Sequence, residues 1–253
     1  MSTVSSSRCA VVFGATGGIG SALVRQLVAE GWRVHAAARG QSRLDALAAE
    51  TGAIVHAVDV TDPAAVDACL GVVQASEGRI DGVAHCVGSL LLKPAHNTTD
   101  ADWAGVIGAN LTSSFHVLRS AAGRMMRTGG GSIVLLSSAV AKHGMVNHEA
   151  IAAAKAGVAG LALSAAATYA RYNLRVNCVA PGLTRTPLVA ALTGNESMLK
   201  ASVALHPLGR IGEPPEIARA IAWFLDPLQS WVTGQMLAVD GGLGSIQSRA
   251  TVS

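Results

Sequence analysis

A histidine and a lysine in the stretch NHEAIAAAK, His148 and Lys155, could do acid–base chemistry. They lie seven residues apart, which is about 700° around an α-helix, so a helix containing both presents them on nearly the same face. An imidazole exchanges protons near neutral pH, and an ammonium group polarises a neighbouring ligand. If the helix begins only near Ala150, this angular argument lapses, and His143, Glu149 or a water becomes the candidate proton donor.

The residues before the alanine run also suit a helix start. Asn147 fits an N-cap, and the carboxylate of Glu149 fits the positive end of the helix dipole. We favour this structural role for Glu149, whereas His148 stays open between chemistry and a plain surface position.

A second stretch, VVFGATGGIGSAL, places Gly14, Gly18 and Gly20 directly after a β-branched run and at the start of an amphipathic segment. In such a turn, glycine lets the chain bend sharply and lets backbone approach a pyrophosphate. The unpaired N–H groups of a helix N-terminus then bind the phosphate oxygens. The turn therefore predicts a dinucleotide site.

The elements around these residues alternate between short β-branched runs and longer segments rich in alanine and leucine. The first long segment closes at Gly31, which fits a helix C-cap. Repeated βα units give parallel strands with right-handed crossovers, covered by helices on both faces. We expect an α/β fold in one domain over residues 1–253, a three-layer doubly wound parallel sheet with an ordered core at about 8–243 and frayed ends at 2–7 and from 247. The seven predicted strands are 9–13, 33–38, 53–60, 82–87, 132–138, 175–182 and 235–241.

Composition narrows the classes of function. Half of the 253 residues are hydrophobic, 14% are charged and the net charge is +3, with no basic run that would predict nucleic acid as a partner. The four cysteines lie far apart and the histidines are not clustered, which predicts neither a disulfide framework nor a metal site. The N-terminal stretch reads as neither a signal peptide nor a membrane span, so we expect a cytoplasmic protein with no membrane partner.

The glycine spacing is GxxxGIG, and with further motifs in order the chain resembles the short-chain dehydrogenases/reductases over nearly its whole length. That family has a Rossmann fold, a nicotinamide coenzyme and oxidoreductase activity. The matching motifs are Asp59-Val60 at the adenine contact, HCVG (85–88) where the family usually has NNAG, Asn110 in GANLTSSF, Ser138 in LLSS, Lys155, and PGLTRT (181–186).

The resemblance assigns roles to these positions. Ser138 and Lys155 would be catalytic, and Asn110 would support them through a helix kink that holds a water beside the lysine. His85 and Cys86 depart from NNAG, so a hydrogen-bonded histidine and a buried thiol are the expected state there. The coenzyme would contact Gly14, Thr16, Gly17, Gly18, Ile19, Gly20, Arg39, Asp59, Val60, Val87, Gly88, Lys155, Pro181, Gly182, Thr184 and Thr186.

The end of the second predicted strand bears on which coenzyme binds. A carboxylate there would bind the adenosine ribose 2′-OH, but Ala38 takes that position and Arg39 follows it. Arginine suits a 2′-phosphate, although Gly17 offers no second cation. NADP(H) is therefore favoured over NAD(H).

The family's acid is a tyrosine four residues before the lysine, and this chain has Ile151 there. Counting thirteen residues forward from Ser138 gives the same position, so the register is not ambiguous. Three interpretations stay open: carbonyl reduction with another acid, for which His148 is best placed; chemistry that needs no tyrosine, such as hydride addition to an alkene or iminium, elimination or isomerisation; or coenzyme binding without turnover.

Two further segments of the sequence bear on the kind of substrate and on the oligomeric state. Residues 187–212 resemble the family's substrate lid, and Leu188, Leu192, Met198 and Leu205 make it partly apolar, so a small or medium, mostly apolar substrate is expected. The helix expected from about Ala150 to Tyr169 has almost no polar face. Together with the helix near Leu111, it predicts a homodimer or homotetramer, as the resemblance also implies.

Overall fold

The computed structural model describes residues 8–246, so the predicted frayed ends, 2–7 and 247 onward, lie outside the described residues. Seven strands, all parallel, form one sheet in the order β3-β2-β1-β4-β5-β6-β7. This is the predicted doubly wound fold, with the order reversing between β1 and β4. The strands are β1 (Cys9–Phe13), β2 (Arg33–Ala38), β3 (Ile54–Ala57), β4 (Gly82–His85), β5 (Gly131–Leu136), β6 (Leu174–Pro181) and β7 (Met236–Val239).

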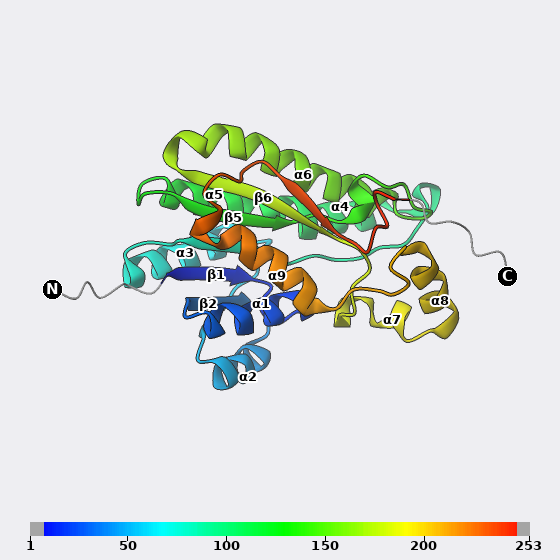
Figure 1. The fold of residues 1–253 in the computed structure, drawn as a ribbon, viewed down its shortest axis with the longest axis horizontal. Helices are drawn as coiled ribbons and strands as arrows, with labels where there is room; N and C mark the ends of the chain where they lie inside the picture. Colours follow the sequence, from blue (N-terminus) through cyan, green and yellow to red (C-terminus); the bar gives the residue numbers. More distant parts are fainter. Residues whose placement is uncertain (1–7, 247–253) are drawn as a thin grey trace.

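Helices cover both faces of the sheet (Figure 1). Alternate residues of each strand enter different cores: Val11 and Phe13 of β1 pack under one layer of helices, whereas Ala10 and Val12 pack under the other. The first layer holds α3 (Pro63–Glu77), α5 (Ser113–Met125) and α6 (Glu149–Tyr169), and the second holds α1 (Gly18–Ala29), α2 (Gln41–Thr51) and α9 (Pro214–Leu225).

Most strands end earlier than the sequence predicted. β3 stops at Ala57, β4 at His85 and β5 at Leu136, because the residues that follow leave the ladder and turn at the carboxyl edge. Asp59, for example, accepts hydrogen bonds from the Thr61 N–H and hydroxyl at 2.9 and 2.8 Å, which fixes a turn. The candidate site residues after these strands therefore lie in loops rather than in the sheet.

The long helical pattern around Asn110 is three elements. α4 (Asp100–Ile107) runs into a π-helical turn, η2 (Gly108–Thr112), and then into α5. A π-turn inserts an extra residue and changes the helix direction, which is the kink that the resemblance implied. Asn110 is fully buried at this turn, so it is not a plain exposed asparagine.

The helix that carries Lys155 begins one residue earlier than expected. α6 starts at Glu149, which lies in its first turn as predicted, but its N-cap is His148 and not Asn147. Asn147 takes a left-handed conformation with φ of 63°, which turns the chain away from the helix axis, so its prediction as N-cap was wrong. His148 therefore lies outside the helix, and the argument from helix angle does not apply.

α6 is also apolar enough, by length and composition, to pass as a membrane span together with the short turn that follows it. One side of it packs on β6 and β5, with Ala154, Val158 and Ala162 in the core. A helix buried in this way is a core helix of the α/β fold. Its opposite side, with Gly160 and Leu163, is exposed on the single chain.

Two short helices, α7 (Ala190–Thr193) and α8 (Glu196–Leu205), follow β6 and lie beyond the carboxyl ends of the strands (Figure 1). The turns at either end of this segment meet, because Gly212 N–H donates to the Leu183 carbonyl at 2.8 Å and Arg185 N–H donates to the Gly212 carbonyl at 2.9 Å. The chain then continues into α9 and β7.

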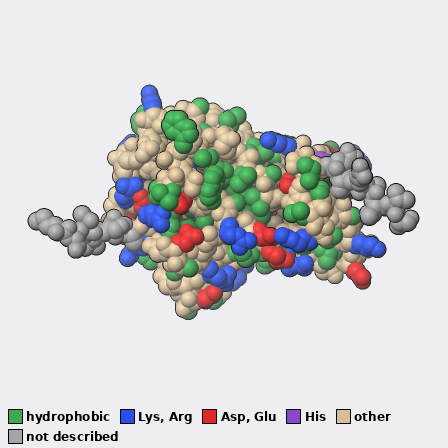
Figure 2. All heavy atoms as spheres, viewed as in Figure 1, with side chains coloured by type: hydrophobic (Ala, Val, Ile, Leu, Met, Phe, Trp, Pro, Cys, Tyr) green, Lys and Arg blue, Asp and Glu red, His purple; other side chains and the backbone are tan. Residues whose placement is uncertain are grey.

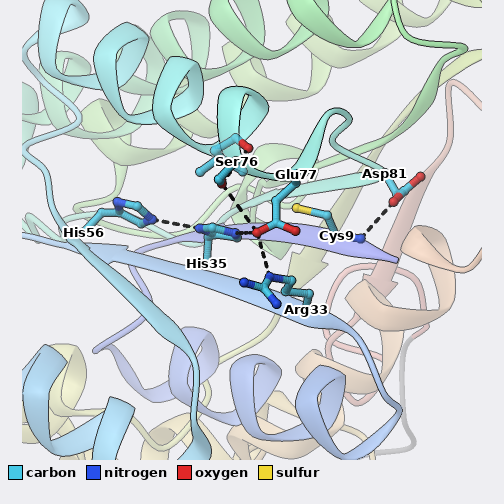
Figure 3. Close-up of polar contacts among 8 residues, drawn as sticks. Cys9, Arg33, His35, His56, Ser76, Glu77 and Asp81 are labelled. Atoms are coloured by element: carbon cyan, nitrogen blue, oxygen red, sulfur yellow. Dashed lines mark hydrogen bonds and ion pairs between the residues drawn. The ribbon is translucent and has the colours of Figure 1, made fainter. Parts of the chain in front are cut away.

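One polar cluster interrupts the apolar packing between β2, β3 and α3 (Figure 3). His35 lies between two partners: its Nδ1 is 2.9 Å from His56 Nε2, and its Nε2 is 3.2 Å from Glu77 Oε1. Arg33 Nε donates to the same carboxylate at 2.6 Å. Cys9 lies beside the cluster, and burial raises the pKa of its thiol to about 12.

Candidate active site

The glycine turn joins β1 to α1. Gly14 has φ of 78°, and its N–H donates to the Ala37 carbonyl at 2.8 Å, which ties the turn to β2. A Cβ on Gly20 would strike the Gly14 carbonyl, and one on Gly18 would lie 2.6 Å from Thr186 Cγ2. α1 begins at Gly18, so its first N–H groups have no carbonyl partner within the helix and face the carboxyl edge. The turn fits a phosphate group.

Arg39 and Asp59 mark the outer end of this edge. Arg39 is exposed directly after β2, and Asp59 follows β3, the neighbouring strand. Hydrogen bonds from the Thr61 N–H and hydroxyl lower the pKa of Asp59, and the charge of Arg39 adds to this. Among residues 8–246 no carboxylate forms an ion pair with Arg39, so its guanidinium is available to an anion.

The other end of the edge opens into a cleft of about 420 Å³. All four predicted catalytic residues contribute to its wall, together with most of the coenzyme positions predicted for the nicotinamide end. Those lining residues are Ile19, Val87, Gly88, Asn110, Ser138, His148, Lys155, Pro181, Gly182, Thr184 and Thr186. The remaining predicted coenzyme residues, Gly14, Thr16, Gly17, Gly18, Gly20, Arg39, Asp59 and Val60, belong to the glycine turn and the outer end.

Lys155 is 8% exposed, and its Nζ donates to the Leu136 carbonyl at 2.9 Å. Ser137 Oγ donates to the Lys155 carbonyl at 2.8 Å, which fixes α6 on the end of β5. Burial in the cleft wall lowers the pKa of Lys155 to about 8. A Cβ on Gly88 would lie 3.0 Å from Asn110 Oδ1 and 3.4 Å from Nζ, so this loop passes close to both side chains.

Asn110 holds the loop after β4 in place. Its Nδ2 donates to Ser89 Oγ and to the Val106 carbonyl, both at 2.9 Å, and its Oδ1 accepts from the Ser89 N–H at 3.2 Å. The Asn110 carbonyl accepts from Ser114 Oγ at 2.6 Å. The asparagine side chain thus links η2 to the loop that carries Gly88. Ser89 was not among the predicted site residues.

Ser138 follows β5 and is half-buried. Its Oγ is 3.5 Å from the Pro181 carbonyl and 3.4 Å from the Val140 N–H, both long for hydrogen bonds. The hydroxyl is weakly held within the chain, so it can turn toward a ligand in the cleft.

His148 and Ile151, three residues apart in the chain, line the same cleft. His148 Nδ1 is 2.7 Å from the Val146 carbonyl, which orients the ring and leaves Nε2 for another partner. The other predicted donors lie elsewhere: His143 and Glu149 are exposed, neither lines the cleft, and Glu149 Oε1 accepts from the Ala95 N–H at 3.4 Å.

His85 lies behind the cleft wall, and Cys86, the next residue, lines the cleft. Ser113 Oγ donates to the Ala109 carbonyl at 2.8 Å, so it accepts from His85 Nε2 at 3.1 Å. Burial lowers the pKa of His85 to about 3 and raises that of Cys86 to about 12, so both stay neutral. His85 Nδ1 has no hydrogen-bond partner among the described residues. The hydrogen-bonded histidine matches the expectation, whereas Cys86 is only half-buried.

Comparisons with known proteins agree with this architecture. The sequence model of the family described as enoyl-(acyl carrier protein) reductase matches residues 14–244. A short-chain type dehydrogenase/reductase from Mycobacterium ulcerans superposes with a TM-score of 0.90 at 32% identity, over 94% of this chain and 90% of that one. The chain belongs to the short-chain dehydrogenase/reductase family.

Two other members of this short-chain family are informative. A cis-4-hydroxycyclohexanecarboxylate dehydrogenase from Sinomonas cyclohexanicum is 38% identical over 94% of this chain and 97% of its own. The structure of an actinorhodin polyketide ketoreductase with NADPH has a TM-score of 0.91 at 31% identity, covering 97% of this chain and all of that one. Relatives of this chain are therefore dehydrogenases and ketoreductases.

Besides Ser89, one more residue of the cleft wall deserves note because no motif in the sequence pointed to it. His206, at the end of α8, is 4% exposed and lines the cleft. No spacing to a known motif marked it, because one of its two hydrogen-bond partners, Leu183, lies 23 residues away in the chain. Among residues 8–246, no group of three or more metal-ligating side chains is suited to hold a metal ion.

Proposed function

We propose that this chain transfers a hydride between NADP(H) and a small or medium, mostly apolar carbonyl or alcohol, with a proton donor other than tyrosine. The proposal is carried by one observation: the glycine turn and Lys155 lie on the same carboxyl edge, and an apolar cleft opens beside the lysine. Parallel α/β sheets bind ligands at this edge, where the strand order reverses.

The chain's own residues fit the coenzyme. The first N–H groups of α1 would bind the pyrophosphate, and Gly88 and Lys155 would hold the nicotinamide ribose. Arg39, which has no ion pair in the described chain, would bind a 2′-phosphate, and this favours NADP(H). When bound, the coenzyme supplies or accepts the hydride.

Ser138 would bind the substrate oxygen, since its hydroxyl is weakly held and lines the cleft. Lys155, charged in most molecules at pH 7, would stabilise negative charge that develops on that oxygen. Apolar side chains of the 187–212 segment line the cleft: Leu188, Leu192, Met198 and Leu205. These contacts favour an apolar substrate, and we propose that this segment is the lid.

His148 would donate the proton. It lines the cleft with Ser138, and the other titratable candidates, His143 and Glu149, do not. With Nδ1 held by the Val146 carbonyl, the protonated ring would donate from Nε2 into the cleft. A water held at the same place is the remaining alternative.

A second candidate is reduction of an activated alkene. Ile151 removes the phenol expected for ketone reduction, and the matching family model carries the description of an enoyl reductase. Elimination, isomerisation or coenzyme binding without turnover would also use the same cleft. Substrate panels that include ketones, enones and imines separate these from the first proposal.

We also propose a homodimer or homotetramer in the cytoplasm. Besides the exposed side of α6, hydrophobic side chains gather over α9 and β7, next to a row of alternating charges (Figure 2). In this part of the chain Trp223 on α9, Leu237 on β7, and Leu228 and Trp231 between them are exposed, Trp231 to 99%. Exposed large hydrophobic side chains that gather in a patch are typical of protein–protein interfaces.

The coenzyme assignment is tested by calorimetry with NADPH and NADH on the wild-type chain and on Arg39→Ala. We expect tighter binding of NADPH, and loss of that preference in Arg39→Ala with little change for NADH. Equal binding of both coenzymes by the wild type would overturn the assignment to NADP(H), and binding of neither would overturn the proposed function as a whole.

A further inference from the structure

His206 joins the end of α8 to the loop after β6. Its Nδ1 lies 2.7 Å from the Ser202 carbonyl, on α8, and its Nε2 lies 3.2 Å from the Leu183 N–H. A backbone N–H can only donate, so Nε2 accepts, and the proton of the neutral ring is on Nδ1, where it donates to Ser202. Each ring nitrogen therefore makes one hydrogen bond, to two different parts of the cleft wall.

The imidazole of His206 is closely packed as well as hydrogen-bonded. A Cβ on Gly182 would lie 2.8 Å from His206 Nε2, and one on Gly241 would lie 3.6 Å from His206 Cβ. The nearby carboxylate of Asp240 is engaged elsewhere, since it accepts from the Gly242 and Gly244 N–H groups, both at 2.9 Å. The imidazole thus sits in a fitted position between the ends of β6 and β7.

α8 itself has little else to hold it. None of its ten residues is buried, although Met198, Ala201, Ser202 and Leu205 line the cleft. Its main packing neighbour is α7, which has no buried residue either. His206 is the buried group at the end of α8, so it is the anchor of a helix that otherwise lies on the surface.

Leu183, the backbone partner of His206, lies in the loop that faces the proposed coenzyme site. Leu183 lies between Gly182 and Thr184, both of which line the cleft at the proposed nicotinamide end. Its carbonyl also accepts from Gly212, where the covering segment returns to the sheet. A movement of α8 would therefore pull on the loop that faces the coenzyme.

We propose that His206 is a positioning residue that couples the covering helix α8 to the coenzyme-facing loop at Leu183. This inference rests on the proposed function. When substrate brings α8 down on the cleft, the imidazole holds Leu183 in place, so that closure and alignment of the coenzyme loop occur together. His206 does not touch the reacting atoms and acts through Leu183 and Ser202.

Three substitutions separate the two hydrogen bonds. His206→Gln can place an amide oxygen where Nε2 lies and so accept from Leu183, whereas His206→Asn reaches only the position of Nδ1. His206→Leu keeps the bulk and loses both bonds. We expect His206→Leu and His206→Asn to raise KM for the carbonyl substrate about tenfold, because the Leu183 N–H loses its hydrogen-bond acceptor. We expect His206→Gln to recover most of this loss and the Kd of NADPH to stay near wild type in all three.

Amide hydrogen exchange provides a readout that needs no turnover. In His206→Leu, the amide of Leu183 and those of residues 196–205 should exchange faster, while β5 and β6 stay protected. His96→Leu, at an exposed histidine outside the cleft, is the matched control and should change nothing.

If amide exchange at Leu183 and in α8, and also KM, are the same in His206→Leu as in the wild type, the proposed coupling is wrong. If KM rises in His206→Leu and rises equally in His206→Gln, the coupling is also contradicted. A side chain that only fills space would give this result, because the hydrogen bond to Leu183 would then not matter. If no substrate is reduced at all, the proposed function fails, and faster exchange of α8 in His206→Leu still supports the link itself.

Discussion

Lys155 and Ile151 lie one helical turn apart on α6, both buried and both in the wall of the same cleft. Ile151 is 3% exposed and packs with Val106, Ala150 and Ala154, so the space next to the amine on this side is apolar. An apolar neighbour favours the uncharged amine, in line with the lowered pKa of Lys155. The position that would share a proton with the lysine is thus closed to proton transfer.

Restoring a phenol is the first test of this relationship. Ile151→Tyr places a hydroxyl four residues before Lys155, and we expect kcat for ketone reduction to rise about 10²-fold, the usual contribution of a positioned acid. Ile151→Phe supplies the same bulk without the hydroxyl and should show no gain. Equal rates for the two variants would mean that the cleft is shaped for other chemistry.

The proton donor is tested by His148→Gln. We expect kcat to fall about 10²-fold, because Gln cannot transfer a proton, while the Kd of NADPH stays unchanged. The matched control is Glu149→Gln, at an exposed residue that does not line the cleft, and it should leave kcat near wild type. A His148→Gln enzyme as fast as the wild type would rule out this donor and favour a water.

Gly18 is predicted to be essential for coenzyme affinity. A Cβ there would lie 2.6 Å from Thr186 Cγ2, so Gly18→Ala forces the turn and the start of the covering segment apart. Overpacking of this kind costs about 1–3 kcal/mol, so calorimetry should show NADPH binding weakened about ten- to hundredfold. Gly18→Ala/Thr186→Ser removes the methyl group in the way and should recover part of the affinity. Wild-type affinity in Gly18→Ala would contradict the geometry of the turn.

Acid should destabilise the fold through the His35 and His56 pair (Figure 3). Burial lowers the pKa of both below the ordinary value of 6.5, although Glu77 partly opposes this for His35. The folded chain therefore binds fewer protons than the unfolded chain below pH 6.5. The two neutral histidines contribute fully to the free energy of unfolding above that pH. This contribution is lost as pH falls, and the free energy of unfolding then decreases by at most about 1.4 kcal/mol per pH unit for each histidine.

Thermal unfolding between pH 8 and pH 5 measures this effect. In His56→Gln the amide can pair with His35 in either protonation state of that ring, so we expect a shallower fall of Tm with acid than in the wild type. A Tm profile that is the same in both proteins would show that the pair does not set the acid sensitivity.

The sequence predicted the sheet and the glycine turn well because both depend on local rules. β-branched runs predict strands, and glycines between strand and helix predict the tight turn at Gly14 and Gly18. Strand ends were less predictable, because residues such as Asp59 leave the ladder through turn contacts that periodicity does not encode. The start of α6 was misplaced for a similar reason, since the left-handed Asn147 is a feature of the turn.

The cleft wall was predictable only where a motif marked it. Ser138, Asn110 and Lys155 do line one cleft, and so does His148, although not by the helical geometry first expected. Ser89 and His206 depend on contacts across 21 and 23 residues of chain, which no local pattern reveals.

Transfer of deuterium tests the central claim most directly. The wild-type enzyme is incubated with NADPH carrying deuterium at the reactive C4 position and with an apolar cyclic ketone such as cyclohexanone, and the alcohol is analysed by mass spectrometry. Hydride transfer in this cleft predicts one deuterium on the carbinol carbon of each product molecule, and with Lys155→Met it predicts little or no alcohol. Tight binding of NADPH with no deuterium in any ketone, enone or imine product would contradict the account.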